Sequence, residues 1–550
     1  MRLSSVFLQV ATFLIYPAVI FTAFLYLYPL FLSCDFPAPT IPKTTCFLEH
    51  TSQDAPRIAQ VAPFRLLALG DPQLEGDSSL PGPEHLNFPS IQALRHRIPS
   101  TDFRGNLELI AVAIRDLFTK DFPLLLWSYR KRLDLLGNDY YLAHIYRTLH
   151  WWLQPTHVTV LGDLIGSQWV NDEEFDWRGW RFWNRVFNGG RRVRDDIKES
   201  GISEILGDDP EWSTRIINVA GNHDIGYAGD IDRARVDRFE QIFGKANWNI
   251  KFQLLPNRTE SSSNKPDFGG PPELRIIVLN SMNLDGPVLD SQLQQETYDF
   301  INQDIIGTSR AVEDRKTGTI VLTHIPLHKE EGICVDAPFF DYCENGLTEQ
   351  NHLSVNAAKG ILEGILGMSA NSKAAAGGMG RNGIILTGHD HEGCDVYHYI
   401  PVEAERDGRE WSATPWRAAR HLVQADTPGV REITVRSMMG SFGGNAGLLS
   451  AWFDYEAGEW RFEYATCALG VQHFWWGVHV LDLVTFLLFA ASLVSWITEK
   501  GTTATNVTKV SLKGKSSKPY TNGHAISTAE SLHADLLTTR QRSTDRVRES

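Results

Sequence analysis

Side chains able to bind metal ions follow five apolar runs of the sequence, at the point where each run ends. These side chains are Asp71, Asp163, Asn222 with His223, His324, and His389 with His391. Binding sites in open α/β sheets form at the carboxyl ends of the strands, so we expect these side chains to lie together. A mixture of carboxylates and imidazoles suits Mn²⁺, Fe or Zn²⁺ better than Ca²⁺ or Mg²⁺.

This set is too large for one ion. Two ions about 3.5–4 Å apart could share Asp163 as a bridging carboxylate and clamp the two oxygens of an in-line displacement at phosphorus. The pattern therefore predicts a dinuclear centre for phosphoryl chemistry.

The apolar runs predict strands that alternate with helical segments, which indicates an α/β domain. The predicted strands are 64–69, 157–161, 214–220, 274–279, 319–322 and 384–386. Three later runs, 396–400, 433–435 and 460–464, could complete a second sheet. The stretch 440–445 resembles a phosphate-binding loop only loosely, and a turn is the favoured interpretation.

The composition is typical of a globular protein and argues against a nucleic-acid binder. Of the 550 residues, 43% are hydrophobic and 21% are charged, which is enough material for a core. The formal net charge of −14 is the opposite of a basic nucleic-acid-binding face. Aromatic residues gather near the chain ends and in one insert, as suits a soluble domain held at a membrane.

Two long apolar segments predict one transmembrane helix at each end of the chain. They are residues 6–32 and 474–497, and about 20 apolar residues are enough to cross a bilayer. The alternative is a cleaved signal peptide for the first segment and a hydrophobic core helix for the second. Asp482 lies within the second segment, and we expect Tyr26 or Tyr28 of the first segment to hydrogen-bond it.

Lysines that follow the second segment favour a cytoplasmic location for that end. They are Lys500, Lys509, Lys513, Lys515 and Lys518. With two spans, residues 1–5 are then cytoplasmic as well. Residues 33–63 form a lumenal stalk, residues 64–470 form a lumenal catalytic domain, and the polar residues 498–550 form a disordered cytoplasmic tail.

All six cysteines fall in the predicted lumenal section, where disulfides persist. Their short spacings make Cys34–Cys46 and Cys334–Cys343 candidate pairs, although other connectivities stay open. Asn257 begins a glycosylation sequon within a loop-like stretch, so it is a candidate glycosylation site.

The ordered motifs resemble those of the calcineurin-like metallophosphoesterases. That family carries, in order, D-x-H, G-D, G-N-H-[D/E], a later His and G-H-x-H, and the resemblance covers roughly residues 64–464. It implies a four-layer α-β-β-α sandwich, in which two packed sheets are flanked by helices. It also implies that one metal is held by Asp71 and His391 and a second by Asn222, His324 and His389, with Asp163 bridging the two.

The same resemblance implies a catalytic role for His223 and one departure from the pattern. His223 should stand beside the scissile phosphate and stabilise charge or protonate the leaving oxygen, while Asp224 holds its ring. Gln73 stands where the family's D-x-H motif has an imidazole. Its carbonyl oxygen or a water molecule would take that place, and an oxygen ligand favours Mn²⁺ over Zn²⁺.

Substrate contacts are expected from two places. The insert 169–187 follows Asp163 and combines acidic with Trp side chains, so Asp176 and Trp177 could receive a cationic amine. An amphipathic helix docked on the sheet is the alternative. His328 is a second candidate, for which an ordinary surface role is the alternative.

Within this family, the chain resembles the membrane-anchored GPI-glycan ethanolamine-phosphate phosphodiesterases of the early secretory pathway. The two spans, the Gly-Asp-Pro-Gln variant and the Trp-rich insert carry this resemblance. It implies a Mn²⁺ enzyme of the endoplasmic reticulum or Golgi membrane that removes ethanolamine phosphate from a mannose of the GPI anchor. That activity would support export of GPI-anchored proteins, with cargo receptors as candidate partners.

Two alternatives to this activity stay open. One is a lumenal phosphoesterase that acts on another lipid head group, a nucleotide or a phosphoprotein. The other is a non-enzymatic trafficking adaptor on a phosphoesterase fold.

Overall fold

The computed structural model describes most of the chain between residues 2 and 513. The described ranges are 2–39, 61–80, 88–97, 103–199, 203–255, 270–344, 346–369, 371, 373–400, 411–424 and 427–513. The candidate glycosylation site Asn257, Cys46, and most of the predicted stalk and tail lie outside these ranges.

A six-stranded sheet carries the first three predicted strands. Its strand order is β16 (Glu459–Ala468), β15 (Asn445–Asp454), β1 (Phe64–Leu69), β2 (His157–Val160), β5 (Arg215–Asn218) and β3 (Arg191–Arg192). β1, β2 and β5 run parallel, and Leu69, Val160 and Asn218 pair in register at their ends. The predicted run 460–464 lies here, in β16, because it pairs antiparallel with β15 rather than with the second sheet.

An eight-stranded sheet carries the later strands. Its order is β13 (Ser412–Pro415), β12 (Cys394–Tyr399), β14 (Gly429–Thr434), β11 (Asn382–Thr387), β8 (Thr317–Leu322), β7 (Glu273–Val278), β6 (Trp248–Gln253) and β4 (Ser203–Ile205). β7, β8, β11 and β14 run parallel, so the carboxyl ends of β8 and β11 are neighbours. A separate hairpin consists of β9 (Phe340–Cys343) and β10 (Gly346–Gln350).

Helices connect the strands, and at least four of them begin at a polar capping residue. Those of the domain are α2 (Pro89–Arg97), α3 (Phe103–Asp116), α4 (Phe122–Leu153), α5 (Asp172–Arg181), α6 (Asp195–Glu199), α7 (Asn222–Ile225), α8 (Arg233–Phe243), α9 (Ser291–Asp299), α10 (Val355–Lys359) and α11 (Trp416–Gln424). The side chains of Asn171, Asp232, Asp290 and Ser354 accept backbone N–H groups at the starts of α5, α8, α9 and α10. Such caps satisfy N–H groups that a helix start leaves unpaired.

Side chains on the two faces of β1 pack into two different clusters. Phe64, Leu66 and Ala68 join a buried cluster that draws residues from both large sheets. Leu67 and Leu69 join a second cluster that contains residues of α4, α5 and α8. This alternation follows from the two-residue period of a strand. The domain therefore combines mixed sheets with helices, as a metallophosphoesterase sandwich requires.

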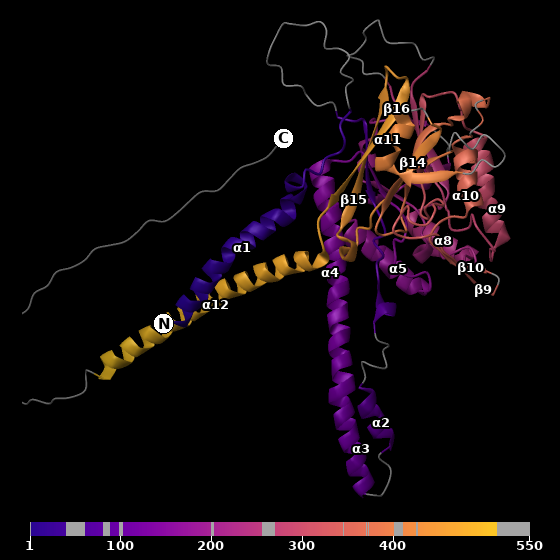
Figure 1. The fold of residues 1–550 in the computed structure, drawn as a ribbon. Helices are drawn as coiled ribbons and strands as arrows, with labels where there is room; N and C mark the ends of the chain where they lie inside the picture. The colour runs from indigo at the N-terminus through magenta and orange to yellow at the C-terminus, as the bar shows by residue number, and fades with distance from the viewer. Residues whose placement is uncertain are drawn as a thin grey trace, which may run out of the picture. The chain divides into compact units, whose positions relative to one another are not determined.

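Two helices are long and apolar enough to cross a membrane, α1 (Leu3–Phe31) and α12 (Gln472–Lys513), which Figure 1 shows at the two ends of the chain. Only 17% and 11% of their most apolar segments are buried, so these side chains do not pack as those of core helices do. The two helices indicate a membrane protein. The helix α12 continues past residue 497 to Lys513, because hydropathy marks the end of an apolar segment and not the end of a helix. The tail boundary at 498 stays a prediction.

The predicted partners of Asp482 are wrong. Thr22 donates its hydroxyl to Asp482 Oδ2 at 2.8 Å, whereas the buried hydroxyl of Tyr28 has no hydrogen-bond partner among the described residues. Thr22 lies one helical turn before Tyr26 on the same face of α1. The expected hydrogen bond between the two spans is present, but its donor lies one helical turn earlier in α1 than predicted.

Both predicted cysteine pairs are wrong as well. The disulfides join Cys34 to Cys467 and Cys334 to Cys394, and Cys343 is exposed and has no disulfide partner within the described ranges. Cys34 follows α1, and Cys467 lies near the end of β16, shortly before α12, so the first bond joins the two points where the domain meets its spans. The fold brings distant cysteines together, and spacing along the chain could not indicate this.

Candidate metal centre

The predicted ligands come from the carboxyl ends of strands in both large sheets. Asp71 follows β1 and Asp163 follows β2, while Asn222 begins α7 after β5. His324 follows β8, and His389 and His391 follow β11. Parallel strands within each sheet align these ends. Hydrogen bonds such as His389 N–H to Asp71 Oδ1 at 3.0 Å join the residues of the two sheets into one centre.

The backbone of this centre is strained. Asp71, Gln73, Asp163 and His389 all have positive φ, between 41° and 74°, although none is glycine. Each such residue costs about 1–3 kcal/mol, and strain of this kind gathers at functional sites. The folded chain therefore holds four of the proposed ligands in conformations that packing around them must enforce.

Glycines allow the strand ends to approach one another closely. A Cβ atom on Gly162, whose φ is 93°, would lie 2.2 Å from His324 Nδ1. A Cβ atom on Gly388 would lie 2.3 Å from the Leu161 carbonyl oxygen. The glycine of the G-D motif and that of the G-H-x-H motif thus make room for ligands contributed by other strands.

Asp163, His324 and His389 form one group whose ligand atoms all lie within 4.8 Å of one another. His324 Nδ1 donates to the Leu161 carbonyl at 2.7 Å, and His389 Nε2 donates to the Gln350 carbonyl at 2.9 Å. These bonds fix the tautomers, leaving His324 Nε2 and His389 Nδ1 free to bind metal. Each of these nitrogens lies 3.0 Å from Asn222 Oδ1, which joins the same group.

Asp71, Asp163 and His391 form a second such group, so Asp163 belongs to both. Gln73 lies between its members: Nε2 is 3.0 Å from Asp163 Oδ2 and 3.1 Å from His391 Nε2. The ring of Phe442 packs against His391 with 4.7 Å between centroids. The Gln73 amide therefore faces both Asp163 and His391 of this group.

The charges of the site fit a cation. Asp71 and Asp163 are buried, and Asp71 Oδ2 has no hydrogen-bond partner among the described residues. Burial raises the pKa of Asp71 to about 8. Burial disfavours a charge on His324, yet the Asp163 and Asp71 carboxylates raise its pKa to about 9. Without metal, the protonated imidazole thus balances the Asp163 carboxylate while Asp71 tends to keep its proton. Divalent ions would take the place of these protons and let both carboxylates be charged.

The predicted role of Asp224 in holding the His223 ring is wrong. Asp224 accepts from the backbone N–H groups of Ile165 at 3.0 Å and Gly221 at 2.8 Å. Because Asp224 is the third residue of α7, its carboxylate closes the helix start instead. His223 Nδ1 is buried without a hydrogen-bond partner among the described residues, and the backbone N–H of His223 donates to Asp163 Oδ1 at 2.9 Å.

The acidic and aromatic side chains of the insert make contacts within the chain. The rings of Trp177 and Trp180 stack with centroids 4.9 Å apart, and the Arg185 guanidinium lies 5.6 Å from each centroid. Phe175 of the same helix is buried, whereas Asp176 is exposed. A cation from this chain already contacts these rings, so substrate binding by Asp176 and Trp177 stays a prediction.

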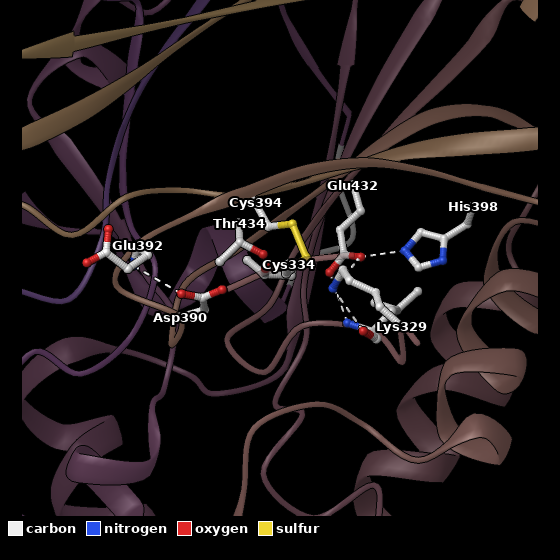
Figure 2. The surroundings of a disulfide bond; sticks show 10 residues. Lys329, Cys334, Asp390, Glu392, Cys394, His398, Glu432 and Thr434 are labelled. Atoms are coloured by element: carbon white, nitrogen blue, oxygen red, sulfur yellow. Dashed lines mark hydrogen bonds and ion pairs between the residues drawn. A yellow bond between two sulfur atoms is a disulfide. The ribbon is translucent and has the colours of Figure 1, made fainter. Parts of the chain in front are cut away.

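His328 lies beside a buried ionic cluster that spacing along the sequence did not indicate. Lys329 Nζ is 3.0 Å from Glu432 Oε2, both side chains are fully buried, and His398 hydrogen-bonds the same carboxylate, as Figure 2 shows. Glu432 also accepts the Leu327 N–H at 2.9 Å. The cluster fixes the segment after His324 to β14. A substrate contact from His328 stays a prediction.

Comparison with known proteins places this centre in a family. No model of a known protein family matches the chain. The chain is 33% identical over 418 residues to Protein TED1 of Saccharomyces cerevisiae, covering 66% of this chain and 79% of that protein. It is 24% identical over 302 residues to Metallophosphoesterase 1 of Danio rerio, covering 52% and 65%. The chain belongs to the metallophosphoesterases, a family of metal-dependent phosphoester hydrolases.

Proposed function

We propose that this chain is a lumenal phosphodiesterase that removes an ethanolamine phosphate side group from a mannose of the GPI anchor glycan. The observation that carries the reaction class is Asp163, which belongs to both groups of candidate ligands. A carboxylate between two ions suits in-line displacement at phosphorus. Two bound divalent ions, which we propose are Mn²⁺, would polarise the phosphoryl oxygens and activate the attacking water.

His223 is the side chain best placed to handle the proton of the leaving group. Its side chain is 36% exposed, whereas Asp163 and His324 are almost wholly buried, and its Nε2 lies 3.9 Å from Asp163 Oδ2. The His223 ring thus lies beside the candidate metal centre and is exposed enough for a substrate to contact it. A protonated His223 can donate to the mannose oxygen as its bond to phosphorus breaks. The proton released by the attacking water restores the imidazolium.

The membrane arrangement supports a substrate that is itself attached to a membrane. The domain lies in the sequence between two candidate spans, and a disulfide joins the points where it meets them. Disulfides persist in the secretory pathway and not in the cytosol, which supports a lumenal domain. The GPI glycan is presented at the lumenal face of the early secretory membranes, where we place this protein.

The test is a mass measurement on the full chain. The protein is purified in detergent, loaded with Mn²⁺ and incubated with GPI glycans that carry ethanolamine phosphate side groups. The expected result is loss of one ethanolamine phosphate mass, with free phosphoethanolamine as the second product. The D163N variant serves as the control that must lack this activity.

Three other outcomes would overturn the proposal in different ways. Hydrolysis only of nucleotides, phosphoproteins or other lipid head groups would make the chain a different lumenal phosphoesterase. Metal binding and cargo binding without hydrolysis of any of these would make it a trafficking adaptor. Full activity in the D163N variant would show that the reaction takes place elsewhere.

A further inference from the structure

A cavity of about 1010 Å³ lies where the two spans meet the domain. Ligand-binding cavities usually enclose about 300–1,000 Å³, so this one is large enough for a sizeable ligand. Its lining contains mostly aromatic and apolar side chains, and none of the residues of the metal centre. The cavity therefore needs an explanation separate from the phosphoesterase site.

The walls come from both candidate membrane spans and from the domain. Tyr26 and Leu27 of α1 face Trp475 and His479 of α12, and α4 closes the cavity with residues 143–152. Aromatic side chains at the end of a span are typical of the level where a membrane meets water. The cavity thus borders the lipid phase and not only the aqueous one.

A proline in α1 explains why α4 is fixed against this wall. Pro29 has no N–H group, so the carbonyl of Leu25, four residues earlier, lacks its helical donor. His144 of α4 supplies a donor from Nε2 at 2.9 Å. Trp152 Nε1 also donates to a carbonyl of α1, that of Tyr26, at 3.0 Å. These bonds make the cavity a preformed feature of the fold.

The charge of the lining is positive. Arg147 supplies this charge, and no carboxylate is among the cavity's lining residues in the described part of the chain. The whole protein carries a net charge of −14, so a lining without acidic residues is a local exception. Such a lining favours an anionic group.

Trp475 offers a hydrogen bond that the protein itself leaves unused. Its side chain is only 7% exposed, and its Nε1–H group has no acceptor within the described ranges. A buried donor without an acceptor is costly, and in native proteins it usually indicates a missing ligand or water. An ester or phosphate oxygen of a bound lipid would satisfy it.

We propose that this cavity binds an anionic glycerophospholipid of the surrounding membrane. An acyl chain lies along the aromatic walls of α1 and α12, and the phosphate lies at Arg147. The bilayer is the source, because two of the three walls are helices able to cross it. This lipid site does not depend on the proposed substrate.

The test uses the full chain in nanodiscs of phosphatidylcholine that contain phosphatidylinositol with a photoactivatable acyl chain. After illumination and digestion, the label is expected on peptides that contain residues 143–152 and 472–479. Phosphatidylcholine keeps the phosphate but adds a choline cation beside Arg147, where the lining offers no carboxylate to balance it. With the same reactive chain it should therefore label these peptides about tenfold less.

Two matched pairs of variants locate the lipid. N188W places a large ring at the cavity rim and should lower labelling about tenfold. N184W should leave it unchanged, because Asn184 makes the same contact to a carbonyl four residues earlier but does not line the cavity. R147Q should remove the preference for the anionic lipid, whereas R130Q, at an exposed position of the same helix, should not. Thermal unfolding checks that each variant is folded.

Several results would overturn the proposal. The proposal fails if the anionic and the neutral lipid label the protein equally, or if the label lies outside the lining peptides. It also fails if N188W and N184W have equal effects on labelling. If a GPI glycolipid displaced the label but unlabelled phosphatidylinositol did not, the cavity would belong to the substrate's lipid instead of a resident one.

Discussion

Gln73 and Asp163 are joined by two hydrogen bonds. The backbone N–H of Gln73 donates to the Asp163 carbonyl oxygen at 2.8 Å, and Gln73 Nε2 donates to Asp163 Oδ2 at 3.0 Å. The residue that departs from the family pattern is therefore held directly on the proposed bridging carboxylate. Turning the amide about its last bond would exchange its nitrogen for its oxygen, which a cation prefers.

This placement predicts that Gln73 sets the metal preference of the first site. Q73H should raise the bound ratio of Zn²⁺ to Mn²⁺ by about tenfold or more, because imidazole suits zinc better than an amide oxygen does. Elemental analysis of protein dialysed against equal concentrations of both ions measures the ratio. Q73A is the control and should lower the metal content without this shift. An unchanged ratio in Q73H would contradict the prediction.

Asp163 is predicted to be required for both ions. D163N should lose both metals together and with them all detectable turnover, since one carboxylate serves both groups of ligands. Metal stoichiometry and hydrolysis are measured on the same sample. H391A is the comparison, because His391 belongs to one group only and should cost one ion. Loss of a single ion in D163N would mean that Asp163 does not bridge.

The order of motifs along the chain was enough to predict which side chains meet, because parallel strands align their carboxyl ends. It could not predict what orients them. Two histidine tautomers depend on the backbone carbonyls of Leu161 and Gln350, and a carbonyl carries no sequence signal. The sequence predicted that the Asp224 carboxylate orients the His223 ring. In the structure it accepts the Gly221 N–H at the start of the short helix α7 instead. The disulfides and the Lys329–Glu432 pair likewise depend on tertiary contacts.

His223 is predicted to act on the leaving group and not as a metal ligand. H223A should lower kcat by roughly 10²–10⁴, the usual contribution of general acid catalysis, and leave the metal content intact. The H223A variant should lose much less activity on a substrate whose leaving group needs no proton, such as a nitrophenyl phosphodiester. Equal losses on both substrates, or loss of metal, would assign His223 a different role.

His144 makes the stability of the protein depend on pH. Burial lowers the pKa of His144 to about 4, whereas an unfolded histidine titrates near 6.5. Between these values the unfolded chain binds the proton first, so stability is complete above about pH 6.5 and falls as the pH is lowered towards 4. The loss that is due to His144 should reach about 2 kcal/mol at pH 5.

The H144Q variant separates this titration from the hydrogen bond. Glutamine can still donate to the Leu25 carbonyl but carries no titrating proton, so the difference in stability between pH 7 and pH 5 should shrink by about 2 kcal/mol. H144L removes the donor as well and should be less stable than H144Q at both pH values by about 1–3 kcal/mol, because the Leu25 carbonyl is left unpaired. Denaturant unfolding of the detergent-solubilised chain measures both quantities. If H144Q kept the full pH dependence of the unchanged protein, other buried histidines would be responsible for it.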